Sequence, residues 1–159
     1  MSNDLNIAIL QLTSVNDFKK NDSQIRDLLG KIPNPKSLDI ISLPENSFFM
    51  RIKEGEQVQY LDLKDPVWDF YKDFARTNDL MIHVGATPLF YNNQNWNATV
   101  LVMPDGSLQT PYQKIHLFDI QLENQKPVRE SDAFQKGSTP HIMTYRGWRL
   151  GFTICYDIR

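Results

Sequence analysis

The chain has 159 residues, 41% hydrophobic and 11% aromatic, a composition typical of a folded protein rather than an intrinsically disordered one. Its 17 basic and 19 acidic residues give a net charge of −2 without a basic run, so a nucleic-acid partner is not expected. The chain starts without a signal-peptide pattern, has no membrane-length apolar run and carries one cysteine, so we expect a cytoplasmic protein without an internal disulfide.

The first half of the chain predicts strands that alternate with helices. Short apolar runs bounded by turn residues predict three strands, at residues 6–12, 38–43 and 80–86. One helix is expected after a capping Asn16 or Asp17, and a second after Asp65-Pro66. Their apolar faces comprise Phe18, Ile25, Leu28 and Leu29 in the first helix and Val67, Phe70, Tyr71 and Phe74 in the second.

The second half predicts hairpins. One joins the strands 98–103 and 107–112 through Pro104-Asp105-Gly106, and another joins 141–145 and 148–154 through Arg146-Gly147. Residues 121–139 are polar and irregular, which predicts a long loop with one helical turn at most. This order predicts a mixed sheet with helices on one face, in one domain without a linker or repeat.

Several familiar catalytic signatures are absent from the sequence. It contains no G-x-S-x-G elbow, no phosphate-binding G-x-x-x-x-G-K-[ST] loop, and neither paired cysteines nor H-E-x-x-H for zinc. The histidines His83, His116 and His141 are scattered, which favours ordinary hydrogen-bonded strand or loop residues over metal ligands. The sequence therefore implies neither a metal nor a cofactor.

Three polar residues stand where predicted strands end. Glu45 follows Pro44, Lys114 follows the second hairpin strand, and Cys155 follows Phe152–Ile154. Each has an ordinary alternative: a carboxylate at a solvated turn, a lysine on an edge strand, or a thiol packed as a small hydrophobic side chain. Together they match a reaction, because an ammonium lowers the pKa of a thiol and stabilises an oxyanion, while a carboxylate accepts the thiol proton.

Three segments around these residues resemble the signatures of the nitrilase superfamily, the carbon–nitrogen hydrolases with a Glu-Lys-Cys triad. They are Leu43–Asn46 (LPEN), Tyr112–Asp119 (YQKIHLFD) and Gly151–Arg159 (GFTICYDIR). All three occur in the family's order and with similar spacing, so the resemblance covers the whole chain.

The resemblance implies a role for each residue. Glu45 would be the general base, Lys114 the stabiliser of the tetrahedral intermediate, and Cys155 the nucleophile. Glu130, in Arg129-Glu130-Ser131, would be a carboxylate that positions the lysine, with an ordinary loop residue as the alternative. The backbone N–H of Tyr156 would contribute to an oxyanion hole.

The segments KIHLFDIQL and RESD are most similar to the omega-amidase and deaminated-glutathione-amidase branch. That likeness implies hydrolysis of the terminal amide of a small dicarboxylic acid monoamide, with a nitrilase or an N-carbamoyl amidase as the alternative. By the same analogy, the full-length form would be a homo-oligomer.

Members of this superfamily are α-β-β-α sandwiches and are longer than this chain. The resemblance therefore implies that residues 1–159 form a carbon–nitrogen hydrolase domain that is incomplete at its C-terminus and holds the N-terminal part of the sandwich. Only residues 156–159 follow the cysteine, too few for a stable helix. We expect the isolated chain to expose apolar sheet surface and to have little or no activity.

Two hypotheses from different classes remain open. In the first, the chain is the N-terminal part of a working amidase, and in the second it is a non-catalytic remnant or a binding protein. The intact triad favours the first, since a remnant has no chemical need for it. Ammonia release from the 159-residue chain that disappears in Cys155→Ala would overturn the expected inactivity. The intact mass of the natural protein, compared with 18.5 kDa, would separate the two hypotheses.

Overall fold

The computed structural model describes residues 4–53, 55–121, 123 and 126–158. Arg159, the last residue of the third signature segment, lies outside them, as do residues 122, 124 and 125 of the predicted long loop. In the described part of the chain, neither helix is long and apolar enough to cross a membrane.

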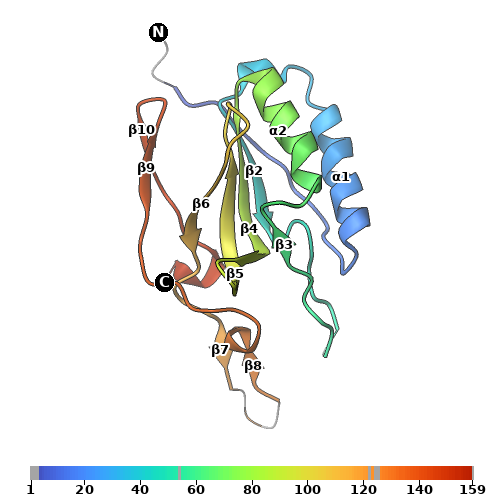
Figure 1. Cartoon of the computed structure of the whole chain (residues 1–159), viewed down its shortest axis with the longest axis vertical. Coiled ribbons are helices and arrows are strands. Elements are labelled where there is room, and N and C mark those ends of the chain that lie inside the picture. Colours follow the sequence, from blue (N-terminus) through green and yellow to red (C-terminus); the bar gives the residue numbers. More distant parts are fainter. Residues whose placement is uncertain (1–3, 54, 122, 124–125, 159) are drawn as a thin grey trace.

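A six-stranded mixed sheet forms the centre of the molecule, as predicted (Figure 1). Its strands follow the order β1-β2-β4-β5-β6, with β3 beside β4. β1, β2, β3 and β4 are parallel where they pair, whereas β5 and β6 run antiparallel. The strand bounds are β1 Ile7–Ile9, β2 Ile40–Glu45, β3 Leu61–Asp62, β4 Met81–Tyr91, β5 Gln94–Val102 and β6 Leu108–Gln113.

Both helices cover one face of this sheet, which confirms the prediction (Figure 1). They are α1 (Phe18–Gly30) and α2 (Val67–Asn78). The Asp17 carboxylate caps α1 by accepting a hydrogen bond from the Lys20 N–H at 3.1 Å. The main core lies between the helices and the sheet and includes Ile25, Leu29, Trp68, Tyr71, Ile41, Ile82 and Val100.

A hairpin of β9 (Ile142–Tyr145) and β10 (Trp148–Gly151) lies against the opposite face. Tyr145 packs on Ile40, Met81 and Leu101, and its hydroxyl donates to the Asp39 carbonyl at 3.1 Å. This hairpin covers part of the second face and leaves Ile7 and Ile9 exposed beside it.

The structure differs from the predicted elements in several places, among them β1, which ends at Ile9 rather than at residue 12. β4 and β5 are longer than expected because Asn92 and Asn93 adopt positive φ angles of 52° and 59° and join them as a hairpin. The predicted long loop contains β8 (Val128–Arg129), which pairs with β7 (Asp119–Ile120) just before the loop. β10 ends at Gly151, so residues 152–154 are not in a strand. Asp65 precedes α2, but its carboxylate accepts from Asp62 N–H instead of capping the helix.

Candidate active site

Glu45 is the last residue of β2 and lies opposite Ala86 of β4. Pro44 is tolerated because it lies beyond Ser42, where the pairing of β2 with β1 ends. The next residue, Asn46, has a φ of +58° and donates its N–H to the Ala86 carbonyl at 2.9 Å. This turn leaves the Glu45 side chain at the carboxyl edge of the sheet, where the sequence placed it.

Lys114 directly follows β6 and has a side chain that is 3% exposed. Its N–H donates to the Asn97 carbonyl of β5 at 2.9 Å, and its own carbonyl accepts from Gly137 N–H at 2.8 Å. Gly137 is required there, since a Cβ would lie 2.1 Å from the Gln113 carbonyl oxygen. The Lys114 backbone is therefore held from both sides, and its side chain is buried rather than free on the surface of the edge strand β6.

Cys155 opens a short 3-10 turn, Cys155–Asp157, with a φ of +47°. That angle is unusual for a residue other than glycine, and such strained positions cluster at functional sites. The Asp157 carboxylate holds the turn by accepting from Ile154 N–H at 2.9 Å, the Tyr112 hydroxyl at 2.7 Å and His116 N–H at 2.8 Å. The cysteine thus stands on a turn fixed to β6, although no strand runs directly into it.

Glu130 begins the 3-10 turn Glu130–Asp132, the helical turn expected in the long loop. Its Oε2 lies 2.9 Å from Lys114 Nζ and accepts from Phe118 N–H at 2.7 Å. The side chain is 13% exposed. This geometry favours the positioning carboxylate over the ordinary loop residue.

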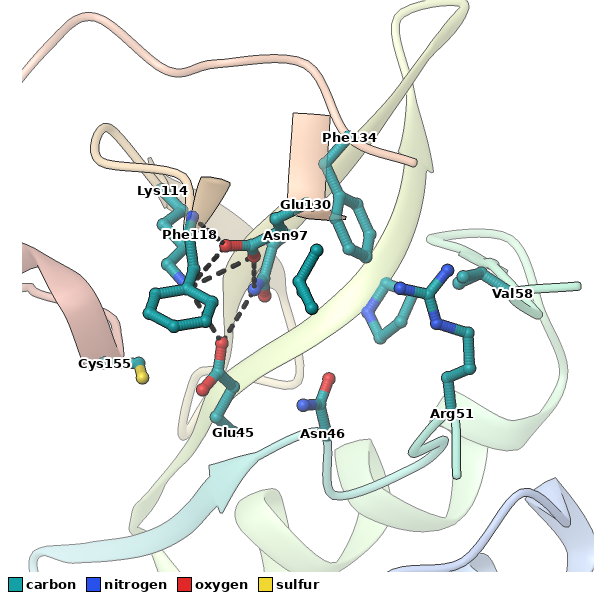
Figure 2. A pocket seen from close by; sticks show the side chains of 12 residues that line it. Glu45, Asn46, Arg51, Val58, Asn97, Lys114, Phe118, Glu130, Phe134 and Cys155 are labelled. Carbon is teal, nitrogen blue, oxygen red and sulfur yellow. Dashed lines mark hydrogen bonds and ion pairs between the residues drawn. The ribbon is translucent and has the colours of Figure 1, made fainter. Parts of the chain in front are cut away.

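Asn97, in the middle of β5, is a site residue that the sequence reasoning missed. Its Nδ2 donates to Glu45 Oε1 and to Glu130 Oε1, each at 2.8 Å (Figure 2). Its Oδ1 is buried and accepts no hydrogen bond from the described residues. Asparagine is uncommon in strands, but Asn97 follows Asn92, Asn93 and Asn95 in the sequence, so nothing in the sequence set it apart.

The charges of these groups change the pKa values of Lys114 and Cys155. Burial alone would lower the Lys114 pKa, but the hydrogen bond to Glu130 and the charges of Glu45 and Glu130 raise it above its usual value. Burial raises the pKa of the Cys155 thiol, and the Glu45 charge raises it further, against the opposing effect of Lys114. Lys114 therefore acts in the expected direction, but burial and Glu45 outweigh it, and the thiol has Glu45 beside it.

A cavity of about 240 Å³ connects these residues. Figure 2 shows Cys155, Glu45 and Lys114 on one side of it and Arg51 and Val58 on the other. Phe118 packs edge-on against Tyr156, which follows Cys155 in the chain. The cavity is lined by Glu45, Asn46, Arg51, Val58, Pro88, Asn97, Lys114, Phe118, Val128, Glu130, Phe134 and Cys155.

The three histidines occupy different environments. His83 Nδ1 lies 2.9 Å from the Ser42 hydroxyl, and burial lowers its pKa to about 4. His116 Nδ1 lies 3.0 Å from Asp157, and the ring of His141 lies against Phe152. Within the ranges that the structure describes, no three metal-ligating side chains gather at one point.

The family model described as carbon-nitrogen hydrolase matches residues 6–159, and the chain belongs to that family. It is 30% identical to the nitrilase and fragile histidine triad fusion protein NitFhit of Caenorhabditis elegans, over 96% of this chain and 36% of that protein. Identity is 25% to deaminated glutathione amidase of Dictyostelium discoideum, over 96% of this chain and 56% of that protein. Identity is 28% to chloroplastic omega-amidase of Arabidopsis thaliana, over 97% of this chain and 43% of that protein.

Solved structures have the same fold. A CN-hydrolase superfamily protein from Xanthomonas campestris superposes with a TM-score of 0.79 at 25% identity, over 98% of this chain and 55% of that chain. The C. elegans NitFhit structure superposes with a TM-score of 0.73 at 26% identity, over 95% of this chain and 38% of that chain. The nitrilase-like α/β fold is therefore confirmed. The chain spans 36% to 56% of the length of the three relatives compared above.

Proposed function

We propose that the protein hydrolyses an amide bond of a small molecule through a thioester on Cys155. The observation that carries this proposal is the convergence of Glu45, Lys114 and Cys155 on one cavity, from three separate parts of the chain. A carboxylate, an ammonium and a thiol supply a base, an electrostatic stabiliser and a nucleophile for acyl transfer.

In the first half of the reaction, Cys155 Sγ attacks the amide carbon while Glu45 accepts the thiol proton. The raised pKa of Cys155 makes this proton transfer necessary, because the resting sulfur is protonated. Lys114 stabilises the oxyanion, together with the backbone N–H of Tyr156. An ammonium has three N–H groups, and Glu45 and Glu130 accept from two of them in the described structure. The intermediate then collapses, and the proton on Glu45 leaves with ammonia.

In the second half, a water molecule attacks the thioester carbon after Glu45 removes its proton. Collapse of the second oxyanion releases the carboxylic acid and returns the proton to the sulfur. Glu45 needs to face the sulfur in both steps. Asn97 and Lys114 keep it there by donating to its Oε1 at 2.8 and 3.3 Å. Glu130 positions Lys114 from the other side.

The substrate in this proposal is the monoamide of a small dicarboxylic acid, cleaved to the acid and ammonia. The names of two relatives, omega-amidase and deaminated glutathione amidase, support this choice of branch. We also propose that the protein is cytoplasmic and works as a homo-oligomer. Residues 1–159 contribute the part of its hydrolase domain that carries the triad.

The test is an ammonia-release assay on the protein purified at the length that its source produces. Succinamic acid, a nitrile and an N-carbamoyl amino acid form the substrate panel. We expect ammonia from succinamic acid and none after Cys155→Ala, with the variant's thermal unfolding unchanged. Release that persists in Cys155→Ala would refute the thioester mechanism, and turnover of the nitrile or carbamoyl compound alone would refute the substrate.

A further inference from the structure

Arg51 contributes a positive charge to the cavity at the side away from Cys155 (Figure 2). It lies in the segment that follows β2, and its residue is exposed. In the described part of the chain, no carboxylate forms an ion pair with Arg51. Its guanidinium therefore remains available for a ligand, and guanidinium binds carboxylates through two parallel hydrogen bonds.

The catalytic side of the cavity is unfavourable for an anionic group. Two carboxylates, Glu45 and Glu130, surround the single ammonium of Lys114, so the cluster has a formal charge of −1. A substrate carboxylate placed there would be repelled, whereas an uncharged amide would not. A substrate that carries both an amide and a carboxylate therefore binds with its amide facing Cys155 and its carboxylate facing Arg51.

The remaining lining side chains, apart from Asn46 and Asn97, are apolar. They are Val58, Pro88, Phe118, Val128 and Phe134. Such a wall suits a short aliphatic segment that separates the amide from the acid.

A second hollow adjoins the first and shares Arg51 and Val128 with it. It is basic, because three further cations and one carboxylate line it: Lys53, Lys126, Arg129 and Asp132. The positive potential therefore extends outward from Arg51, which favours the entry of anionic molecules.

We propose that Arg51 is a specificity residue that binds the carboxylate of an omega-amide acid, opposite the scissile amide. The catalytic part of this statement rests on the proposed function, but the binding part does not. The ligand has an uncharged amide, a short aliphatic chain and a terminal carboxylate.

The experiment compares succinamic acid with its uncharged methyl ester, using the protein at its natural length. In Arg51→Gln, we expect kcat/KM for the acid to fall roughly ten- to hundredfold, mainly through KM, with little change for the ester. Arg51→Lys should retain part of the preference because it keeps the charge. Arg149→Gln, the same charge change on β10, is the matched control and should alter neither substrate.

A binding measurement separates this proposal from the catalytic one. In a Cys155→Ala background, calorimetry should show that Arg51→Gln weakens succinamic acid binding roughly ten- to hundredfold. Absence of turnover together with that loss of binding would refute the proposed reaction and support the carboxylate site. The assignment of Arg51 would be overturned if Arg51→Gln had the wild-type kcat/KM for succinamic acid. It would also be overturned if the variant lost kcat/KM equally for the acid and the ester.

Discussion

Glu45 and Glu130 share two donors, the Lys114 ammonium and the Asn97 amide. Two carboxylates this close would repel each other without such donors, because the cluster is largely buried. Asn97 is uncharged and adds two N–H bonds without altering the charge balance. It therefore fixes the Glu45 carboxylate, the proposed base, relative to Lys114.

Replacing Asn97 should impair catalysis without unfolding the protein. For Asn97→Ala we expect kcat/KM to fall about 10- to 100-fold, since hydrogen bonds to charged groups contribute about 1.5–3 kcal/mol. Steady-state ammonia release measures the effect. Asn95→Ala is the matched control on the same strand, because the Asn95 side chain forms no hydrogen bond to the described residues. Equal activities of the two variants would contradict the role of Asn97.

The reactivity of Cys155 should reveal the charge of its neighbour. Its raised pKa means that alkylation by iodoacetamide should increase with pH and level off only above the usual thiol range. Glu45→Gln removes a negative charge and should lower that apparent pKa, whereas Lys114→Met should raise it. Intact-mass analysis of alkylation against pH measures all three proteins. A Glu45→Gln profile identical to that of the wild type would contradict the contact between Glu45 and Cys155.

Most of the candidate site could be predicted from the sequence, because its reactive side chains lie in recognisable sequence patterns. Glu45, Lys114 and Cys155 stood at the ends of apolar segments and inside recognisable motifs. Asn97 and Arg51 carried no comparable pattern, since a single amide or guanidinium becomes meaningful only when its neighbours in space are known. The direction of the cysteine pKa shift also required the structure, because it depends on the balance between burial, Glu45 and Lys114.

At the scale of elements, the turn Cys155–Asp157 depends on β6 for its position. The Asp157 side chain is 3% exposed and links the turn to Tyr112 and His116. These hydrogen bonds lower the pKa of Asp157 against the opposing effect of burial. A folded-state pKa below the unfolded value means that the carboxylate stabilises the protein above pH about 4 and that this contribution is lost in acid.

Asp157→Asn should therefore destabilise the protein at neutral pH and also reduce activity. We expect a loss of about 1–3 kcal/mol, because an amide cannot accept from all three donors. Chemical unfolding at pH 7 and below pH 4 measures it, and the difference from the wild type should shrink in acid. Asp69→Asn, at a carboxylate that is 71% exposed, is the control and should change stability little. A difference that is independent of pH would contradict the account.

The helices were predictable because their apolar residues recur at helical spacing and because Asp17 marks a start. The β4–β5 hairpin was partly missed, since its turn consists of two asparagines rather than the more recognisable Asn-Gly. Residues 152–154 have a strand-like composition, but a strand also requires a partner, which the pattern of one segment does not reveal.

For the whole molecule, the sheet face opposite the helices is only partly covered. Ile9 is 78% and Ile7 49% exposed on β1, an edge strand of the described sheet. Both border a hollow of about 350 Å³, which is also lined by Leu150 and Phe152. Exposed apolar surface beside a free strand edge favours association.

A polypeptide of residues 1–159 alone should therefore self-associate. Sedimentation velocity should show species larger than the 18.5 kDa monomer, and Ile9→Lys should reduce their amount. Ile52→Lys, at an isoleucine that is 56% exposed in the segment after β2, is the control and should have a smaller effect. A monodisperse monomer at all concentrations would contradict this expectation.

The measurement that tests the central claim most directly is rapid-quench mass spectrometry of the natural-length protein mixed with succinamic acid. Our account predicts a transient mass increase equal to the acyl group, located on the peptide that contains Cys155 and absent in Cys155→Ala. Ammonia release without any acyl-enzyme, or an adduct on another residue, would contradict the assignment of Cys155 as the nucleophile.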